Sequence, residues 1–108
     1  MNPEKLFASV VMMILLLAPL LLRAAGDAGR GEQVFGLCRV CHQAAGKEEK
    51  IGPSLKGLFQ KQKLRNGKAP TEENVLAVVD RGSTAMPAYE GILSDQEKED
   101  LLAYLKTL

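Results

Sequence analysis

Two thiols and one imidazole lie close together in the short segment Cys38-Arg39-Val40-Cys41-His42. On a helical turn, residues three positions apart have Cβ atoms about 5 to 6 Å apart, so both thiols would lie on one face. C-x-x-C-H is the attachment motif for c-type haem, in which the two thiols form thioethers and the imidazole binds the iron. The segment therefore predicts one covalently bound haem c, held through Cys38 and Cys41, with His42 as an iron ligand.

Zinc binding and dithiol exchange are the two other uses of such a cysteine pair. A structural zinc site needs four protein ligands, whereas the chain contains two cysteines and one histidine in total. A dithiol oxidoreductase places its C-x-x-C after a strand in a β-α-β unit, and no strand pattern precedes Cys38. A disulfide between the two cysteines would close a very short loop and constrain little. Haem attachment is favoured over these uses.

The sixth position of the iron decides whether such a domain carries electrons or binds small molecules. Beyond the apolar N-terminal segment one methionine remains, Met86, on a predicted loop between helices. Pro87 biases Met86 toward an extended backbone, and a thioether ligand would favour Fe(II) and close the iron to other ligands. We therefore predict His42 and Met86 as the two metal ligands. The alternative for Met86 is gap filling in the core, a common use of methionine.

An open sixth position would give a different function, that of a haem-dependent enzyme or a small-ligand-binding haem domain. Such a site would need polar residues beside the open position. The chain has no second histidine, so acid or base catalysis would depend on Tyr, Arg or carboxylate side chains. The inventory of side chains favours an electron carrier that is not an enzyme.

An uncharged apolar stretch of 17 residues occupies positions 6–22. As a helix it would reach about 26 Å, slightly short of the hydrocarbon layer of about 30 Å. Residues 1–26 are therefore predicted to be either a signal peptide, cut after Gly26 or Ala28, or an N-terminal membrane anchor that tethers the chain through residues 6–22. Both outcomes export residues 27–108, to the bacterial periplasm or to the outer face of the cytoplasmic membrane.

The exported part, residues 27–108, holds 12 basic and 12 acidic side chains, which is no signature of nucleic-acid binding. The charges are nevertheless segregated along the chain. Residues 56–68 contain five basic and no acidic side chains, whereas residues 90–100 contain five acidic side chains and one basic. Each run is either ordinary solvated surface or a patch that steers a charged redox partner.

Two helices are predicted from local signals on either side of a long loop. Asp27 can cap a helix that runs through Cys38. Thr71 can cap another helix, with acidic residues in its first turn and Gly82 as its terminator. The connection between them lacks sustained helical periodicity and is predicted to be a loop with one turn near residues 55–60.

A last helix is predicted from Ser94 and Glu97, which have the spacing of a capping box, and its apolar residues continue to the C-terminus. No run alternates in the manner of a strand, so the predicted fold class is all-α. Residues 27–108 contain no Trp and two Phe, which is little apolar material for a core. A large covalent cofactor would fill this shortage and give the long loops something to wrap around.

These elements together resemble a monohaem class I cytochrome c across nearly the whole of residues 27–108. The family's elements occur in order: Gly31 and Phe35, the C-x-x-C-H segment, Gly52-Pro53-Ser54-Leu55, Met86-Pro87-Ala88-Tyr89, and Leu101-Leu102-Ala103-Tyr104-Leu105. The resemblance implies a class I cytochrome c-like fold, with three to four short helices and long loops around one haem. It also implies a monomer that cycles between Fe(II) and Fe(III) and exchanges electrons with redox protein partners.

Two side-chain contacts are implied by the same resemblance. Where the first and last helices of the domain cross, Gly31 would admit the ring of Tyr104. The carbonyl of Pro53 would receive the Nδ1 proton of His42 and so belong to the cofactor-binding site, because such an acceptor fixes the imidazole and strengthens the ligand.

Two features depart from commoner members of the family. The chain has no Trp, so any ring near the haem propionates must be replaced, and Tyr89 is a candidate. The basic segment 60–68 carries no family signature, and no haem contact is assigned to it.

Overall fold

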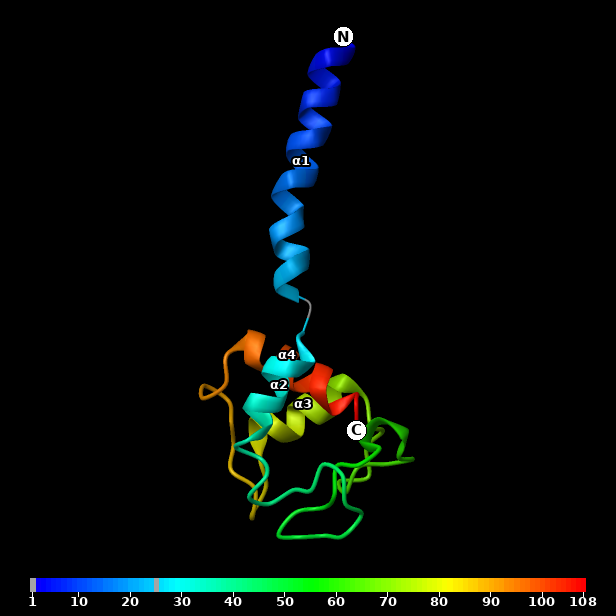
Figure 1. Ribbon diagram of the computed structural model, residues 1–108, viewed down its shortest axis with the longest axis vertical. Helices are drawn as coiled ribbons and strands as arrows, with labels where there is room; N and C mark the ends of the chain where they lie inside the picture. Colours follow the sequence, from blue (N-terminus) through cyan, green and yellow to red (C-terminus); the bar gives the residue numbers. More distant parts are fainter. Residues whose placement is uncertain (1, 25) are drawn as a thin grey trace.

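The computed structural model describes the backbone of residues 2–24 and 26–108, and the side chains of residues 2–13 and 26–108. Its elements are α1 (Pro3–Ala24), α2 (Ala28–Phe35), the 3-10 turn η1 (Leu58–Gln60), α3 (Glu72–Arg81) and α4 (Asp95–Leu105). No strand occurs in this described part of the chain. The prediction of an all-α fold is confirmed. Figure 1 shows α1 projecting from a globular body that α2, α3, α4 and the loops form.

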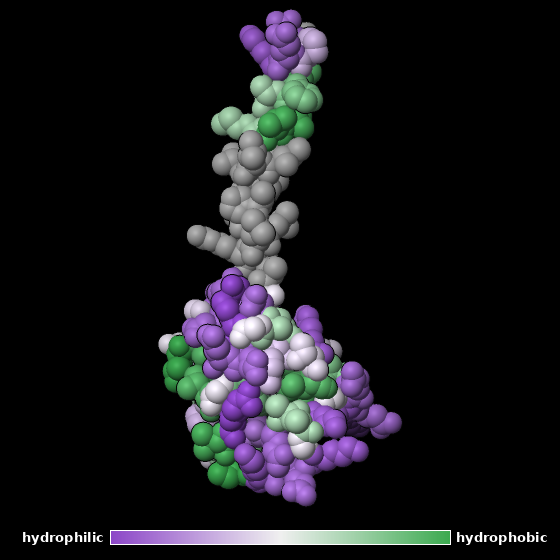
Figure 2. All heavy atoms as spheres, viewed as in Figure 1, coloured by the Kyte–Doolittle hydropathy of each residue, from purple (hydrophilic) through white to green (hydrophobic). Residues whose placement is uncertain are grey.

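Apolar side chains cover the described part of α1. Leu6, Phe7, Met12 and Met13 are all exposed, and Figure 2 shows this apolar surface beyond the polar N-terminal end. Among the residues that the structure describes, no helix is both long and apolar enough to span a bilayer. Within the predicted leader, residues 1 and 25 and the side chains of residues 14–24 lie outside this description. Its role as signal peptide or anchor stays a prediction.

The helix starts in α2 and α3 follow the predicted capping residues. The Asp27 carboxylate accepts a hydrogen bond from the backbone N–H of Arg30, at 2.7 Å. The Thr71 hydroxyl accepts one from Asn74, at 3.1 Å. Each cap satisfies a backbone donor that the first helical turn leaves without an intrahelical partner. Both predicted starts are confirmed.

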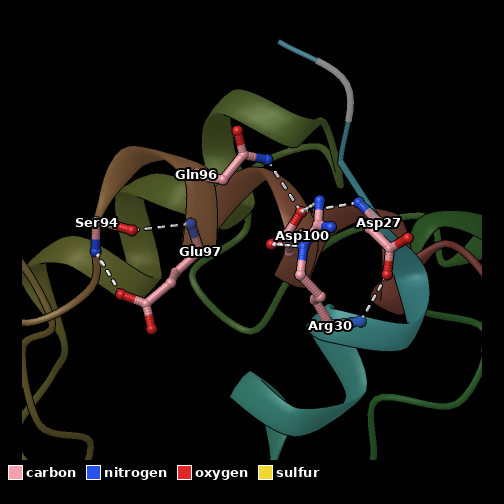
Figure 3. Close-up of polar contacts among 6 residues, drawn as sticks. All are labelled: Asp27, Arg30, Ser94, Gln96, Glu97 and Asp100. Atoms are coloured by element: carbon pink, nitrogen blue, oxygen red, sulfur yellow. Dashed lines mark hydrogen bonds and ion pairs between the residues drawn. The ribbon is translucent and has the colours of Figure 1, made fainter. Parts of the chain in front are cut away.

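The start of α4 has the predicted capping box, which Figure 3 shows. The Ser94 hydroxyl accepts from the Glu97 backbone N–H at 3.1 Å, and the Glu97 carboxylate accepts from the Ser94 N–H at 3.0 Å. Two donors are thereby satisfied reciprocally at the start of the helix.

The predicted end of α2 is wrong by three residues. The α-helix ends at Phe35, not at Cys38, and turns continue through Cys41. The backbone N–H groups of Gly36, Leu37 and Cys38 donate to carbonyls three positions back, at 2.8 to 3.1 Å. The chain thus tightens from α-helical to 3-10 bonding at Gly36, where glycine has little helix propensity.

The core lies where α2 crosses α4, and its largest fully buried side chains are Phe35 and Leu101. Gly31 is buried at this crossing. The two helices approach so closely there that a Cβ added at residue 31 would lie 2.8 Å from Cβ of Tyr104. The rings of Phe35 and Tyr104 pack with centroids 5.2 Å apart. The expected close contact between the first and last helices of the domain is present. Smaller buried residues complete the core: Leu58, Val75, Val79, Leu93, Leu102 and Leu105.

One member of the predicted acidic surface run is buried. Asp100 on α4 is 3% exposed, and it accepts hydrogen bonds from the backbone N–H of Asp27, the guanidinium of Arg30 and the amide of Gln96 (Figure 3). The expectation that all five acids of residues 90–100 form a surface is therefore wrong for Asp100. Its carboxylate instead joins the start of α2 to α4.

Candidate functional site

The segment from Cys38 to His42 forms a hydrogen-bonded turn. The backbone N–H groups of Cys41 and His42 both donate to the Cys38 carbonyl, at 3.1 and 2.9 Å. Both cysteines are half-buried, and they are not joined in a disulfide. The turn therefore places two thiols and an imidazole within one short stretch of backbone, as thioether attachment beside an iron ligand requires.

The Cys38 thiol lies in a partly buried environment. Burial raises the pKa of the Cys38 thiol, and the neighbouring Cys41 raises it further. Dithiol oxidoreductases and redox sensors show the opposite shift, since their reactive thiol is held as a thiolate by a lowered pKa. The environment of Cys38 therefore does not support the dithiol-exchange alternative.

The imidazole of His42 is held by the backbone of a second segment. Its Nδ1 lies 2.7 Å from the carbonyl oxygen of Pro53. A carbonyl can only accept, so this contact keeps the proton on Nδ1 and leaves the Nε2 lone pair for a metal. The Gly52 N–H donates to the Cys41 carbonyl at 2.8 Å, which ties the two segments together beside the ring.

Gly52 is required by the space around this ring. A Cβ added at Gly52 would lie 2.8 Å from Nδ1 of His42, closer than real Cβ atoms approach such a neighbour. The sequence places Gly52 in the Gly-Pro element but does not give this reason for it. The steric role follows only from the path of the loop, which brings residue 52 against the imidazole.

Met86 lies on a tight loop that begins where α3 ends. Gly82 has a φ of 64°, a left-handed conformation that favours glycine, and its N–H donates to the Val78 carbonyl. The Ser83 N–H then donates to the Met86 carbonyl at 2.9 Å. The side chain of Met86 is half-buried and packs against the core, as Cys38 also does.

Tyr89 lies three residues after Met86, and its side chain packs against the core. Burial raises the pKa of the Tyr89 hydroxyl, and the nearby Cys38 and Cys41 raise it further. Its backbone N–H donates to the Val79 carbonyl at 3.0 Å, which fixes the loop against α3. Cys38, Met86 and Tyr89 all pack against the same hydrophobic core. Whether Tyr89 replaces a Trp near the haem propionates stays a prediction.

The donor set fits a covalent haem better than a bare metal ion. Over the part of the chain that the structure describes, no three His, Cys, Asp or Glu side chains gather as a metal site would need. What the site offers instead is a thiol pair, an imidazole with Nδ1 on a carbonyl, and a half-buried thioether beside apolar side chains. The fold and this donor set define a c-type cytochrome.

Comparison with known proteins gives the same class. The family model for cytochrome c matches residues 28–108. Cytochrome c2 from Blastochloris viridis is 33% identical over 100 residues, covering 77% of this chain and 79% of that protein. Cytochrome c6 from Thermosynechococcus vestitus is 32% identical over 105 residues, covering 94% and 90%. The solved structure of cytochrome c6 from the diatom Phaeodactylum tricornutum is 39% identical, with a TM-score of 0.57, covering 76% of this chain and 93% of that one.

The chain belongs to the cytochrome c family and is a monohaem class I c-type cytochrome. It has the class I cytochrome fold. It carries one haem c, bound covalently through Cys38 and Cys41, and it transfers electrons. The predicted family, fold class, cofactor and electron-transfer function are confirmed.

Proposed function

We propose that His42 and Met86 are the axial ligands of the iron, and that the protein shuttles single electrons without transforming a substrate. The observation that carries the proposal is the 2.7 Å contact between Nδ1 of His42 and the Pro53 carbonyl, which presents Nε2 as a ligand. When bound, the haem supplies reversible exchange between Fe(II) and Fe(III). The part of the protein in electron transfer is to hold the side chains of His42 and Met86 in place.

The loop from Gly82 to Pro87 positions the thioether. The left-handed turn at Gly82 ends α3, and the hydrogen bond from Ser83 to the Met86 carbonyl closes the loop. Pro87 restricts the backbone of Met86 to extended conformations. A thioether held in this way excludes small molecules from the sixth position, which supports an electron carrier over an enzyme or a ligand-binding domain.

Replacing the sulfur of Met86 while keeping its volume tests the ligand assignment. In Met86→Leu the apolar packing is nearly conserved. We expect the oxidised protein to lose the weak far-red band of thioether-to-iron charge transfer, and the reduction potential to fall by on the order of 0.1 V. Leu76→Ala is the control, because Leu76 also packs against the core but has no sulfur. If Met86→Leu kept both the band and the potential, Met86 would be core filler.

We further propose that the domain is exported as a monomer, to the bacterial periplasm or the outer face of the cytoplasmic membrane, where it meets charged redox proteins. The leader and the haem-attachment motif support export. The partner surface is supported by the exposed basic residues Lys56, Lys63 and Lys68.

Small redox reagents of opposite charge test this surface. Lys63→Glu should slow electron exchange with an anionic metal complex, speed it with a cationic one, and lose both effects at high salt. Equal rates with both reagents would show that the basic run is only solvated surface.

A further inference from the structure

Ser54 is buried in the long loop between the haem-attachment turn and η1, directly after the carbonyl that accepts from His42. It is 7% exposed. Its hydroxyl donates to the Gly46 carbonyl, and it accepts from the Lys56 N–H at 3.2 Å. One buried hydroxyl thereby links the backbone of Gly46 to that of Lys56, which restrains the loop around residue 54.

The carbonyl of Ser54 has a charged partner. The ammonium of Lys61 donates to it at 2.6 Å, in a partly buried setting. Hydrogen bonds from a charged donor are shorter and about twice as strong as neutral ones. The two consecutive carbonyls of Pro53 and Ser54 are therefore both engaged, one by the imidazole and the other by an ammonium.

Lys61 directly follows η1, and Leu58 and Phe59 of that turn belong to the core or pack against it. Leu58 at the start of η1 is 6% exposed. The N–H of Gly57 donates to the carbonyl of Leu108 at 2.9 Å, which fastens this turn to the end of the chain after α4. The ammonium is thus presented from a fixed element to an otherwise irregular loop.

We infer that Lys61 is a positioning residue for the axial imidazole: by holding the Ser54 carbonyl, it fixes the adjacent Pro53 carbonyl on Nδ1 of His42. The inference depends on the proposed ligation of the iron by His42. Between residues 43 and 57 the loop has no helix, and the backbone hydrogen bonds on either side of residues 53 and 54 are those from Gly52 to Cys41 and from Leu55 to Gln43, both at 2.8 Å. Neither of these bonds involves the carbonyl of Pro53 or that of Ser54. A charged clamp one residue from the acceptor therefore limits how far the Pro53 peptide can move.

Solvent exchange of the His42 Nδ1 proton, measured by NMR in the reduced holoprotein, tests the clamp. In Lys61→Met we expect this proton to exchange about tenfold faster, because loss of the charged hydrogen bond lets the Pro53 carbonyl leave the ring more often. Lys61→Arg should restore slow exchange. Lys63→Met is the matched control, because it removes the same charge from an exposed residue two positions away and should leave the exchange unchanged.

Equal exchange in wild type and Lys61→Met overturns the inference, as does equal acceleration in Lys61→Met and Lys63→Met, which would indicate a general charge effect. If Lys61→Met does not mature, Lys61→Leu replaces it, since leucine also has no donor for the Ser54 carbonyl: faster exchange than wild type supports the clamp, and unchanged exchange overturns it. Failure of the proposed ligation would be visible separately, since the His42 ring protons of the wild-type protein would then lack the large shifts that a haem-bound imidazole shows.

Discussion

Gly31 of α2 lies directly against the backbone carbonyl of Asp100 in α4. A side chain at residue 31 would meet this carbonyl and the Cβ of Tyr104, so the distance between the two helices depends on the missing Cβ. α2 leads directly into the haem-attachment turn. The crossing therefore determines where that turn begins.

Gly31→Ala is expected to destabilise the fold even though Ala is the better helix former by about 1 kcal/mol. The added methyl group must push α2 away from α4, which costs about 1 to 3 kcal/mol in a packed interior. Denaturant unfolding of the holoprotein measures the change. Gly29→Ala is the control, because Gly29 is in the same helix but exposed, and the nearest atom to the new Cβ would be a carboxylate oxygen of Asp27 at 3.2 Å. Equal stability of Gly31→Ala and wild type would contradict a tight crossing.

Asp100→Asn is expected to lower the free energy of unfolding by about 2 kcal/mol, because it weakens charged hydrogen bonds to a buried group. Arg30 Nε donates to Asp100 at 3.1 Å and the Asp27 backbone N–H at 2.8 Å. Thermal or denaturant unfolding at neutral pH gives the difference. Glu99→Gln, an exposed neighbour on α4, should change stability little. A loss in Glu99→Gln as large as that in Asp100→Asn would rule out a specific role for the network.

The capping signals that predicted α2, α3 and α4 are local, which is why sequence reasoning placed their starts correctly. Thr71 and Ser94 each act on backbone donors within the next three residues, so no knowledge of the fold is needed. The end of α2 depended instead on how the chain turns after Gly36 to present the cysteines. That change to 3-10 bonding has no comparably strong local signal.

Contacts between segments distant in the sequence could be predicted only where the family resemblance implied them. The contact of His42 with Pro53 and the crossing at Gly31 could be expected in that way. The bond from Lys61 to the Ser54 carbonyl could not, because a lysine in a basic run looks like solvated surface until the loop's path is known. The burial of Asp100 was missed for the same reason, since its partners come from another helix.

The stabilising effect of Asp100 should depend on pH in a definite direction. The Arg30 guanidinium and, next, the Asp27 backbone N–H lower the pKa of the Asp100 carboxyl below its ordinary value. A carboxyl with a lowered folded-state pKa stabilises the fold fully above its unfolded value of about 4. That stability is lost as the pH falls below this value and through the folded-state pKa.

The difference in unfolding free energy between wild type and Asp100→Asn should therefore be constant from pH 7 to about 5 and shrink below pH 4. Urea unfolding at a series of pH values measures it. The matching difference for Glu99→Gln should stay small throughout. A wild-type advantage over Asp100→Asn that grew as the pH fell would show that the charge of Asp100 is not what stabilises the junction.

Gly52→Ala is expected to disturb the haem site itself without removing any group that binds the cofactor. The new Cβ would lie 2.8 Å from Nδ1 of His42, so the imidazole must tilt away and its contact with the Pro53 carbonyl must lengthen. Because that contact makes the imidazole a stronger donor to iron, we expect the reduction potential to rise and the free energy of unfolding to fall by about 1 to 3 kcal/mol, while the haem stays covalently attached.

Voltammetry, denaturant unfolding and a haem stain of the denatured protein measure the three quantities for Gly52→Ala. Ile51→Ala is the matched control, because Ile51 precedes Gly52 in the same loop and its side chain is 66% exposed. It should leave the potential unchanged. If both variants shifted the potential equally, the loop as a whole would be responsible. If neither variant shifted the potential, a methyl group at residue 52 would not displace the imidazole. The Gly52-Pro53 segment would then have no role in orienting His42.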